Sequence, residues 1–173
     1  IKTIFLDRDG VINKEVGYLH KIEDFKFIEG IFEACLFFLR LDYQIIIVSN
    51  QSGIGRGYYT EDDYKKLTLW MLNQFSIKNI SILDSFHCPH GPDSECSCRK
   101  PMPGMLFEAR DKFNIDMSKS WLIGDKETDI EAANLAGIVN TILVKSGHLI
   151  NESNSNSKFI INSIRDSVNI IKN

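Results

Sequence analysis

The chain has 173 residues and a formal net charge of −3, with 43% hydrophobic and 25% charged residues. This length predicts one domain, residues 1–173, with room for a sizeable core, and the composition is ordinary for a soluble globular protein. The acidic balance argues against binding to nucleic acid or to a membrane surface, since both usually need an excess of basic residues.

Short apolar runs alternate with amphipathic segments along the first half of the chain. Residues 4–6 form an apolar run that ends abruptly in charged residues and Gly10, which is typical of a buried strand opening into a loop. The next stretch lacks periodicity and predicts mostly loop as far as residue 29. A helix is then expected over about residues 30–41, followed by a β-branched strand over residues 44–49. That strand leads into a glycine-rich loop.

The second half continues the alternation. Thr60 and Asp63 predict a capped helix that runs through Phe75. Further elements are expected in this order: a strand over residues 81–87, a helix over about 105–114, a strand over 120–124, a helix ending at Gly137, a strand over 140–144, a polar mobile loop at 151–157 and a short helix over 164–171. Strands that alternate with helices predict an α/β fold, with a parallel sheet covered on both faces.

Carboxylates follow two of the predicted strands at the point where each strand ends. Asp7, Asp9 and Asp125, with Asp129 nearby, are expected to meet at one edge of the sheet. Three carboxylates suit Mg²⁺, which would offset charge repulsion while Asp7 attacks a phosphoryl group. Asp9 would protonate the leaving oxygen and afterwards activate water. The alternative is a set of carboxylates that cap helices.

Hydrogen-bond donors for phosphoryl oxygens are expected at the same edge of the sheet. They are Ser49, Lys100, Lys126 and the backbone N–H groups of residues 50–53. Lys100 should also hold Asp7 ionised, since a nearby cation favours the charged form of a carboxyl group. Arg56 and Arg99 offer planar guanidinium groups for a second anionic group, although solvated surface bases are the alternative interpretation.

A third group of residues has the spacing of a metal site. It is the C-x-H-x5-C-x-C set Cys88, His90, Cys96 and Cys98. These ligands suit tetrahedral Zn²⁺, and a site closed by four protein ligands is expected to be structural. Its task would be to fix the loop that carries Arg99 and Lys100. Clustered cysteines of this kind favour a metal in a reducing compartment over a disulfide, so we expect a cytoplasmic protein. His20, His87 and His148 are interpreted as ordinary polar residues.

The ordered motifs resemble those of the haloacid dehalogenase superfamily of phosphohydrolases. They are DRDG at residues 7–10, Ser49, Lys100, and GDK at residues 124–126 with Asp129. The resemblance implies a phosphoaspartyl enzyme on a Rossmann-like sheet with a minimal cap. It also implies Mg²⁺ held by Asp7, the Asp9 carbonyl and Asp125, with the Lys126 backbone as a further contact.

Within that superfamily the chain resembles the heptose 1,7-bisphosphate phosphatases, through DRDGVIN, GYLH, SNQSGIGRG, the cysteine loop and CRKPMPGM. This implies a small phosphorylated sugar as substrate, loss of its C7 phosphate, and a place in nucleotide-activated heptose synthesis for lipopolysaccharide. The residues implied to border the substrate are Arg8, Glu15, Val16, Gly17, Tyr18, Ser49, Asn50, Gln51, Ser52, Arg56, Arg99, Lys100 and Lys126. We expect the protein to act as a monomer.

Two features depart from that family. Ser49 stands where the family commonly has Thr, which preserves the hydroxyl group. The short cysteine loop also occurs in histidinol-phosphate phosphatases, which are therefore the alternative substrate class. A polynucleotide 3′-phosphatase and a non-catalytic zinc-stabilised binding module are further alternatives; the acidic charge argues against the first and the Asp7/Asp9 pair against the second.

Overall fold

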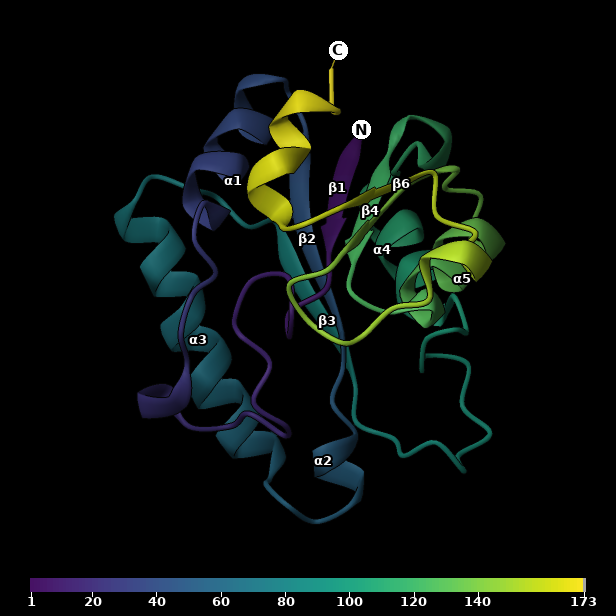
Figure 1. The fold of residues 1–173 in the computed structure, drawn as a ribbon. Helices are drawn as coiled ribbons and strands as arrows, with labels where there is room; N and C mark the ends of the chain where they lie inside the picture. The colour runs from purple at the N-terminus through teal and green to yellow at the C-terminus, as the bar shows by residue number, and fades with distance from the viewer. Residues whose placement is uncertain (173) are drawn as a thin grey trace.

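Six parallel strands form the centre of the structure, a computed structural model that describes residues 1–172 (Figure 1). The strands are β1 (Thr3–Leu6), β2 (Gln44–Asn50), β3 (Asp84–Cys88), β4 (Trp121–Gly124), β5 (Asn140–Val144) and β6 (Phe159–Ile161). They lie in the order β3-β2-β1-β4-β5-β6, and every neighbouring pair is parallel. The predicted parallel α/β sheet is confirmed.

Helices cover both faces of the sheet (Figure 1). One face carries α1 (Ile31–Arg40) and α3 (Glu61–Ile77), and the other carries α4 (Gly104–Phe113) and α5 (Glu127–Leu135). The single helical turn α2 (Ser52–Gly55) follows β2 directly. Four 3₁₀ turns complete the described elements: η1 (Ile22–Asp24), η2 (Met117–Lys119), η3 (Glu152–Asn154) and η4 (Ile164–Asn169).

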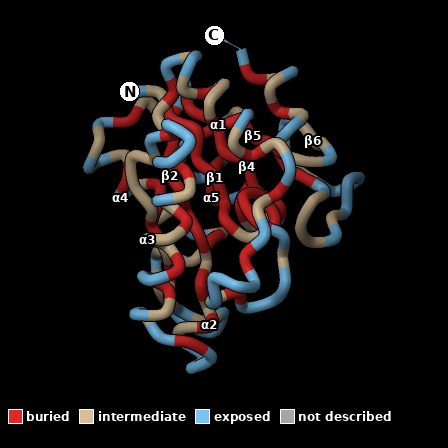
Figure 2. The backbone as a smooth tube through the Cα atoms, turned by 90° about the vertical axis from the view of Figure 1, so that its left-hand side faces the viewer, coloured by how far each residue is buried: buried red, intermediate tan, exposed pale blue. Residues whose placement is uncertain are grey.

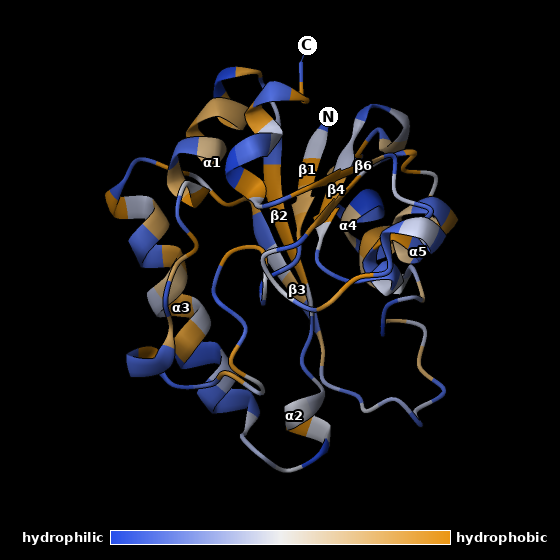
Figure 3. Cartoon of the chain, viewed as in Figure 1, coloured by the Kyte–Doolittle hydropathy of each residue, from blue (hydrophilic) through white to orange (hydrophobic). Residues whose placement is uncertain are grey.

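The strands are apolar on both sides because each side packs against a helical layer. Ile4 and Leu6 of β1 point into the core beneath α1 and α3, whereas Phe5 points into the core beneath α4 and α5. All three side chains are fully buried, and the strands form the buried, hydrophobic centre of the molecule (Figures 2 and 3). Such continuous apolar runs are typical of parallel strands covered on both faces.

Several boundaries differ from the sequence-based prediction. β3 begins at Asp84 rather than at residue 81, because its ladder with β2 starts where Asp84 pairs with Ile46. The start of α5, for which only the end at Gly137 had been predicted, is Glu127, because the Asp129 carboxylate accepts from the N–H of Lys126 and caps the helix. The predicted glycine loop contains the helical turn α2, and residues 159–161 add a sixth strand at the sheet edge.

The sheet order places a switch point between β1 and β4. From β1 the chain moves outward through β2 and β3, then returns to the other side of β1 to build β4, β5 and β6. In open parallel sheets this arrangement leaves a crevice beyond the carboxyl ends of the central strands, where ligands bind. It sets Asp7, after β1, beside Asp125, after β4. Within the described part of the chain, no helix is both long and apolar enough to cross a membrane.

Candidate active site and cysteine cluster

A polar cavity of about 340 Å³ opens at the carboxyl ends of the central strands. The sequence-predicted residues that line it are Asp7, Asp9, Glu15, Gly17, Tyr18, Asn50, Gln51, Ser52, Arg56, Arg99, Lys100, Asp125 and Lys126. Three other predicted residues lie outside the lining: Arg8 and Ser49 are buried beside the cavity, and Val16 is 55% exposed on the surface loop. Segments from five separate parts of the chain therefore meet at one place.

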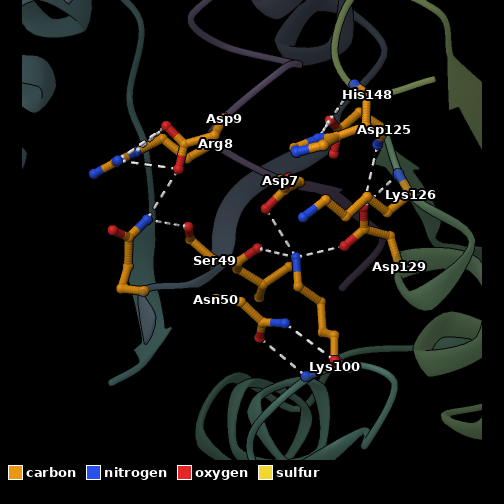
Figure 4. Close-up of polar contacts among 12 residues, drawn as sticks. Asp7, Arg8, Asp9, Ser49, Asn50, Lys100, Asp125, Lys126, Asp129 and His148 are labelled. Carbon is orange, nitrogen blue, oxygen red and sulfur yellow. Dashed lines mark hydrogen bonds and ion pairs between the residues drawn. The ribbon is translucent and has the colours of Figure 1, made fainter. Parts of the chain in front are cut away.

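Lys100 lies at the centre of a buried charge cluster (Figure 4). Its Nζ donates to Asp7 Oδ1 at 2.8 Å and to the Val48 carbonyl at 2.8 Å, and lies 2.6 Å from Asp129 Oδ1. Burial by itself lowers the pKa of a lysine, but Asp129 and Asp7 outweigh it and raise the pKa of Lys100. The Asn50 amide fixes this segment, because it bonds both the N–H and the carbonyl of Lys100 at 3.0 Å.

Asp7 is held in an environment that disfavours its charge. Burial raises the pKa of the Asp7 carboxyl group well above its usual value, and the neighbouring carboxylates Asp129 and Asp125 add to this, while Lys100 opposes it. Oxygen atoms of Asp7, Asp125 and Asp129 lie within 4.8 Å of one another. One ammonium group therefore faces three clustered acids, so the charge of a further cation would be compensated there.

Asp125 has one carboxylate oxygen that the protein satisfies and one that it does not. Oδ2 accepts from the backbone N–H of His148 at 3.0 Å and lies 2.6 Å from His148 Nδ1. Among the described residues, nothing bonds the buried Oδ1. Gly10 and Gly147 enclose the group so closely that a Cβ atom on either would lie within 2.4 Å of Oδ2. A buried carboxylate oxygen without a partner fits the oxygen coordination that Mg²⁺ prefers.

Both carboxylate oxygens of Asp129 bond to groups of the protein itself. Oδ2 accepts from the backbone N–H groups of Asp125 and Lys126 at 3.1 and 3.0 Å, and Oδ1 pairs with Lys100. The carboxylate packs on Gly124, where a Cβ atom would lie 2.3 Å from that of Asp129. Asp129 therefore fixes the start of α5 and the ammonium group of Lys100 together.

Asp9 is oriented by side chains on the far side of the cavity from Lys100 (Figure 4). Arg8 Nη2 donates to its two oxygens at 2.9 and 3.0 Å, Asn13 Nδ2 donates at 3.0 Å and Gln51 Nε2 at 3.1 Å. Arg8 is only 2% exposed and also donates to the Leu19 carbonyl. The structure thus places Arg8 beneath Asp9, as its support, and away from the space where a substrate would lie.

The mouth of the cavity is formed by two surface loops. Gly17 and Tyr18 both have positive φ angles of 70° and 50°, and the Glu15 carboxylate accepts from the Gly17 N–H at 2.6 Å. The Tyr18 ring meets Tyr58 edge to face at 4.7 Å, and the Arg56 guanidinium lies 5.8 Å from the Tyr18 ring. The loop after β1 and the loop after α2 are therefore in contact across the entrance.

The four predicted zinc ligands gather at the end of β3. His90 Nδ1 lies 3.4 Å from the sulfur of Cys88 and 3.3 Å from that of Cys98, and Cys96 lies 3.7 Å from Cys88, sulfur to sulfur. All four ligand atoms lie within 4.8 Å of one another, and the cysteines are free thiols. Three sulfurs and one imidazole nitrogen in such a group fit a tetrahedral zinc ion.

The cysteine loop is tied to the rest of the cavity wall. The backbone N–H groups of Gln51 and Gly55 donate to the carbonyls of Cys88 and Pro89 at 2.7 and 2.9 Å. Arg99 Nη1 donates to the His90 carbonyl at 3.3 Å. Because of these hydrogen bonds, an ordered cysteine loop helps to fix the positions of α2 and of the segment that carries Lys100.

Sequence reasoning missed part of the cavity wall. Tyr59, Thr128 and His148 also line it, and Asp129 was named there only as a nearby acid. His148 was interpreted as an ordinary polar residue, yet it bonds Asp125 through its backbone and its ring. The position of His148 could have been inferred from the sequence, because it lies shortly after β5. That strand is parallel to β4, so its carboxyl end must reach the same edge of the sheet.

An open parallel sheet with paired acids and a buried lysine at its switch point suits a phosphoryl-transfer hydrolase. The family model described as HAD-hydrolase-like matches residues 97–167 of the chain. The chain is 51% identical over 164 residues to the D-glycero-α-D-manno-heptose-1,7-bisphosphate 7-phosphatase of Photorhabdus laumondii, covering 91% of this chain and 90% of the relative. It is 42% identical over 180 residues to the β-anomer 7-phosphatase of the same organism, covering 99% and 96%.

A solved structure supports the same relationship. The D,D-heptose 1,7-bisphosphate phosphatase from B. bronchiseptica, complexed with magnesium and phosphate, superposes with a TM-score of 0.85 at 26% identity, covering 98% of this chain and 97% of that one. The chain therefore belongs to the haloacid dehalogenase (HAD)-like hydrolases, in the family of these heptose-bisphosphate phosphatases. It is a phosphatase, and the family resemblance expected from the sequence is confirmed.

Proposed function

We propose that the enzyme removes the C7 phosphate of D-glycero-α-D-manno-heptose 1,7-bisphosphate through an aspartyl phosphate on Asp7. The observation that carries this proposal is the pairing of Asp7 with Lys100, at 2.8 Å, in the wall of the cavity. Lys100 holds the nucleophile in place and offers positive charge where phosphoryl oxygens approach.

The chemistry divides into two displacements. Asp7 attacks phosphorus, and the bond to the sugar oxygen breaks while Asp9 gives that oxygen a proton. Asp9 then takes a proton from the water that attacks the phosphoaspartate, which frees inorganic phosphate and restores Asp7. Lys100, Ser49 and Lys126 donate to the phosphoryl oxygens.

A magnesium ion would be held by Asp7, the Asp9 carbonyl and Asp125. Its support here is the unpartnered Oδ1 of Asp125 within the group of acids. When bound, the ion neutralises charge between the phosphoryl group and Asp7. A zinc ion at Cys88, His90, Cys96 and Cys98 would have a structural role only.

The substrate proposal rests on charge and on the relatives. Arg56, Arg99 and Lys126 line the cavity, and within residues 1–172 none of them has a carboxylate partner at ion-pair distance. They suit the second phosphate of a bisphosphate. The α anomer is favoured because the chain is 51% identical to the α enzyme of P. laumondii and 42% identical to its β enzyme.

Phosphate release from purified substrates tests this assignment. We expect the highest kcat/KM with the α anomer, less with the β anomer, and little with fructose 1,6-bisphosphate or histidinol phosphate. Equal rates for the two anomers would contradict the anomer assignment. A preference for histidinol phosphate would contradict the sugar substrate altogether, while leaving the phosphatase chemistry in place.

Removal of a zinc ligand is expected to weaken both the loop and catalysis. Cys98→Ser should abolish binding of about one zinc per chain, lower the Tm and reduce kcat/KM, because Arg99 and Lys100 directly follow the lost ligand. Metal content is measured by mass spectrometry beside a thermal melt. Cys35→Ala is the matched control, since Cys35 lies on the core-facing side of α1 and its replacement should leave zinc content unchanged. Full activity and an unchanged Tm in zinc-free protein would contradict a structural role.

The metal-free enzyme is expected to lose stability as the pH rises. Burial raises the pKa of Asp125 to about 6, above its unfolded value, so the folded state holds this proton more tightly than the unfolded state. Stability present at pH 4 should therefore fall by roughly 2–3 kcal/mol as the pH passes through 6.

Magnesium should restore that stability, because the cation offsets the negative charge of the ionised carboxylates. We expect Mg²⁺ to raise the Tm more at pH 7.5 than at pH 5, and we expect Asp125→Asn to remove most of both effects. Denaturant unfolding and thermal melts with and without Mg²⁺ measure them. An Asp125→Asn variant whose Tm still rises with Mg²⁺ as in the wild type would place the metal elsewhere.

A further inference from the structure

The side-chain amide of Gln51 joins three groups of the cavity wall. Its Nε2 donates to Asp9 Oδ2 at 3.1 Å and to Ser49 Oγ at 2.6 Å, and its Oε1 accepts from the Tyr59 hydroxyl at 2.5 Å. Gln51, Ser49 and Tyr59 are only 3%, 1% and 6% exposed. The amide therefore links the acid/base carboxylate to a phosphoryl-binding hydroxyl, shielded from water.

The direction of each hydrogen bond in this series of linked side chains follows from the groups at its two ends. The NH₂ end of Gln51 faces Asp9, whose carboxyl oxygens accept from it as they accept from Arg8 and Asn13. The carbonyl end then faces Tyr59, whose hydroxyl must donate. Ser49 accepts from the same NH₂ group, which leaves its own proton free for a phosphoryl oxygen.

Tyr59 is itself firmly placed. Its ring lies against Gly53, where a Cβ atom would approach the ring to 2.1 Å, and it stacks on His20 with 5.0 Å between centroids and 8° between planes. A fixed hydroxyl donor opposes rotation of the amide by 180°. Such a rotation would turn Oε1 toward the Asp9 carboxylate and would draw the Ser49 proton to Gln51.

We propose that Tyr59 is a positioning residue that acts through Gln51 to orient Asp9 and Ser49 together. This inference rests on the proposed function, because it concerns the groups that would move the proton and bind the phosphoryl oxygens. Tyr59 does not bind the substrate in this scheme. Its effect therefore falls on kcat and not on KM.

The Tyr59→Phe variant tests the proposal, because it keeps the stacked ring and removes only the hydroxyl. With the heptose bisphosphate we expect kcat to fall about ten-fold with KM unchanged within about two-fold. In single-turnover measurements with p-nitrophenyl phosphate, we expect a much smaller fall in the rate of nitrophenol release. That leaving group needs no proton, so the orientation of Asp9 matters less for this step.

A double variant shows whether Tyr59 acts through the amide. Gln51→Met keeps the side-chain length and removes both ends of the bridge. Adding Tyr59→Phe to Gln51→Met should change kcat by less than about two-fold, since the group on which Tyr59 acts is already gone. Tyr43→Phe, a buried tyrosine just before β2, is the matched control and should keep wild-type kinetics.

Three results would overturn the proposal. They are wild-type kcat in Tyr59→Phe, a rise in KM at constant kcat, and a full additional loss on top of Gln51→Met. Failure of the proposed function would look different, because the wild-type chain itself would then release little or no phosphate from the heptose bisphosphate. Thermal melts of each variant confirm that the fold is retained.

Discussion

Asp7→Asn is expected to reduce phosphate release by at least about 10³-fold, because an amide oxygen cannot form the aspartyl phosphate. The fold should remain intact and the Tm should equal or exceed that of the wild type. Burial already raises the pKa of Asp7 well above its usual value, so a neutral group is easily accommodated there. Initial rates of phosphate release and a thermal melt measure both effects.

Asp111→Asn is the matched control for that substitution. Asp111 lies on α4 with 68% of its side chain exposed, so the same chemical change there should leave activity unaltered. A second variant separates the two displacements. With p-nitrophenyl phosphate, Asp9→Asn should release about one equivalent of nitrophenol per active site and then stall, because the phosphoaspartate needs a base for hydrolysis. Turnover retained in Asp7→Asn would refute the covalent mechanism.

Lys100→Met is expected to lower the free energy of unfolding by about 3–5 kcal/mol, in addition to abolishing catalysis. The substitution keeps the aliphatic stem but leaves Asp7 and Asp129 buried without their shared ammonium group. Removing one partner of a buried ion pair is costly because the remaining charge is neither solvated nor paired. Urea unfolding of the metal-free protein at pH 7.5 measures the loss.

The origin of that loss can be tested by rescue. Combining Lys100→Met with Asp129→Asn should recover part of the stability, because one of the two stranded charges is then removed. The deficit should also shrink as the pH is lowered, because burial raises the pKa of the Asp7 carboxyl group and so favours its neutral form. Lys112→Met, at a lysine with 57% exposure, is the control and should unfold like the wild type. A Lys100→Met protein as stable as this control would exclude a charge-compensating role.

Much of the site could be predicted because it follows strand ends. Asp7, Ser49 and Asp125 each come at the end of an apolar run, and parallel strands bring such ends to one edge whatever the loops do. The cysteine loop could be predicted for another reason. Its ligands are close in the chain, so their spacing alone limits how they can gather around a metal.

The orientations of side chains could not be predicted in this way. Arg8 was expected to border the substrate, but its guanidinium turns back beneath Asp9 and reaches the Leu19 carbonyl. His148 and Asp125 are 23 residues apart and meet only because β4 and β5 are neighbours. The candidate catalytic residues were thus determined locally, by residue type at each strand end.

Which groups hold those residues in place was decided by packing between distant segments. The contact of Tyr59 with Gln51 depends on a one-turn helix, α2, that the glycine-rich sequence did not predict. Hydrogen bonds of this kind depend on angles and on distances to within a few tenths of an ångström, which residue spacing does not define. The sequence by itself therefore determined the sheet, the acids, the lysine and the candidate metal ligands, and only the tertiary structure decided how they are oriented.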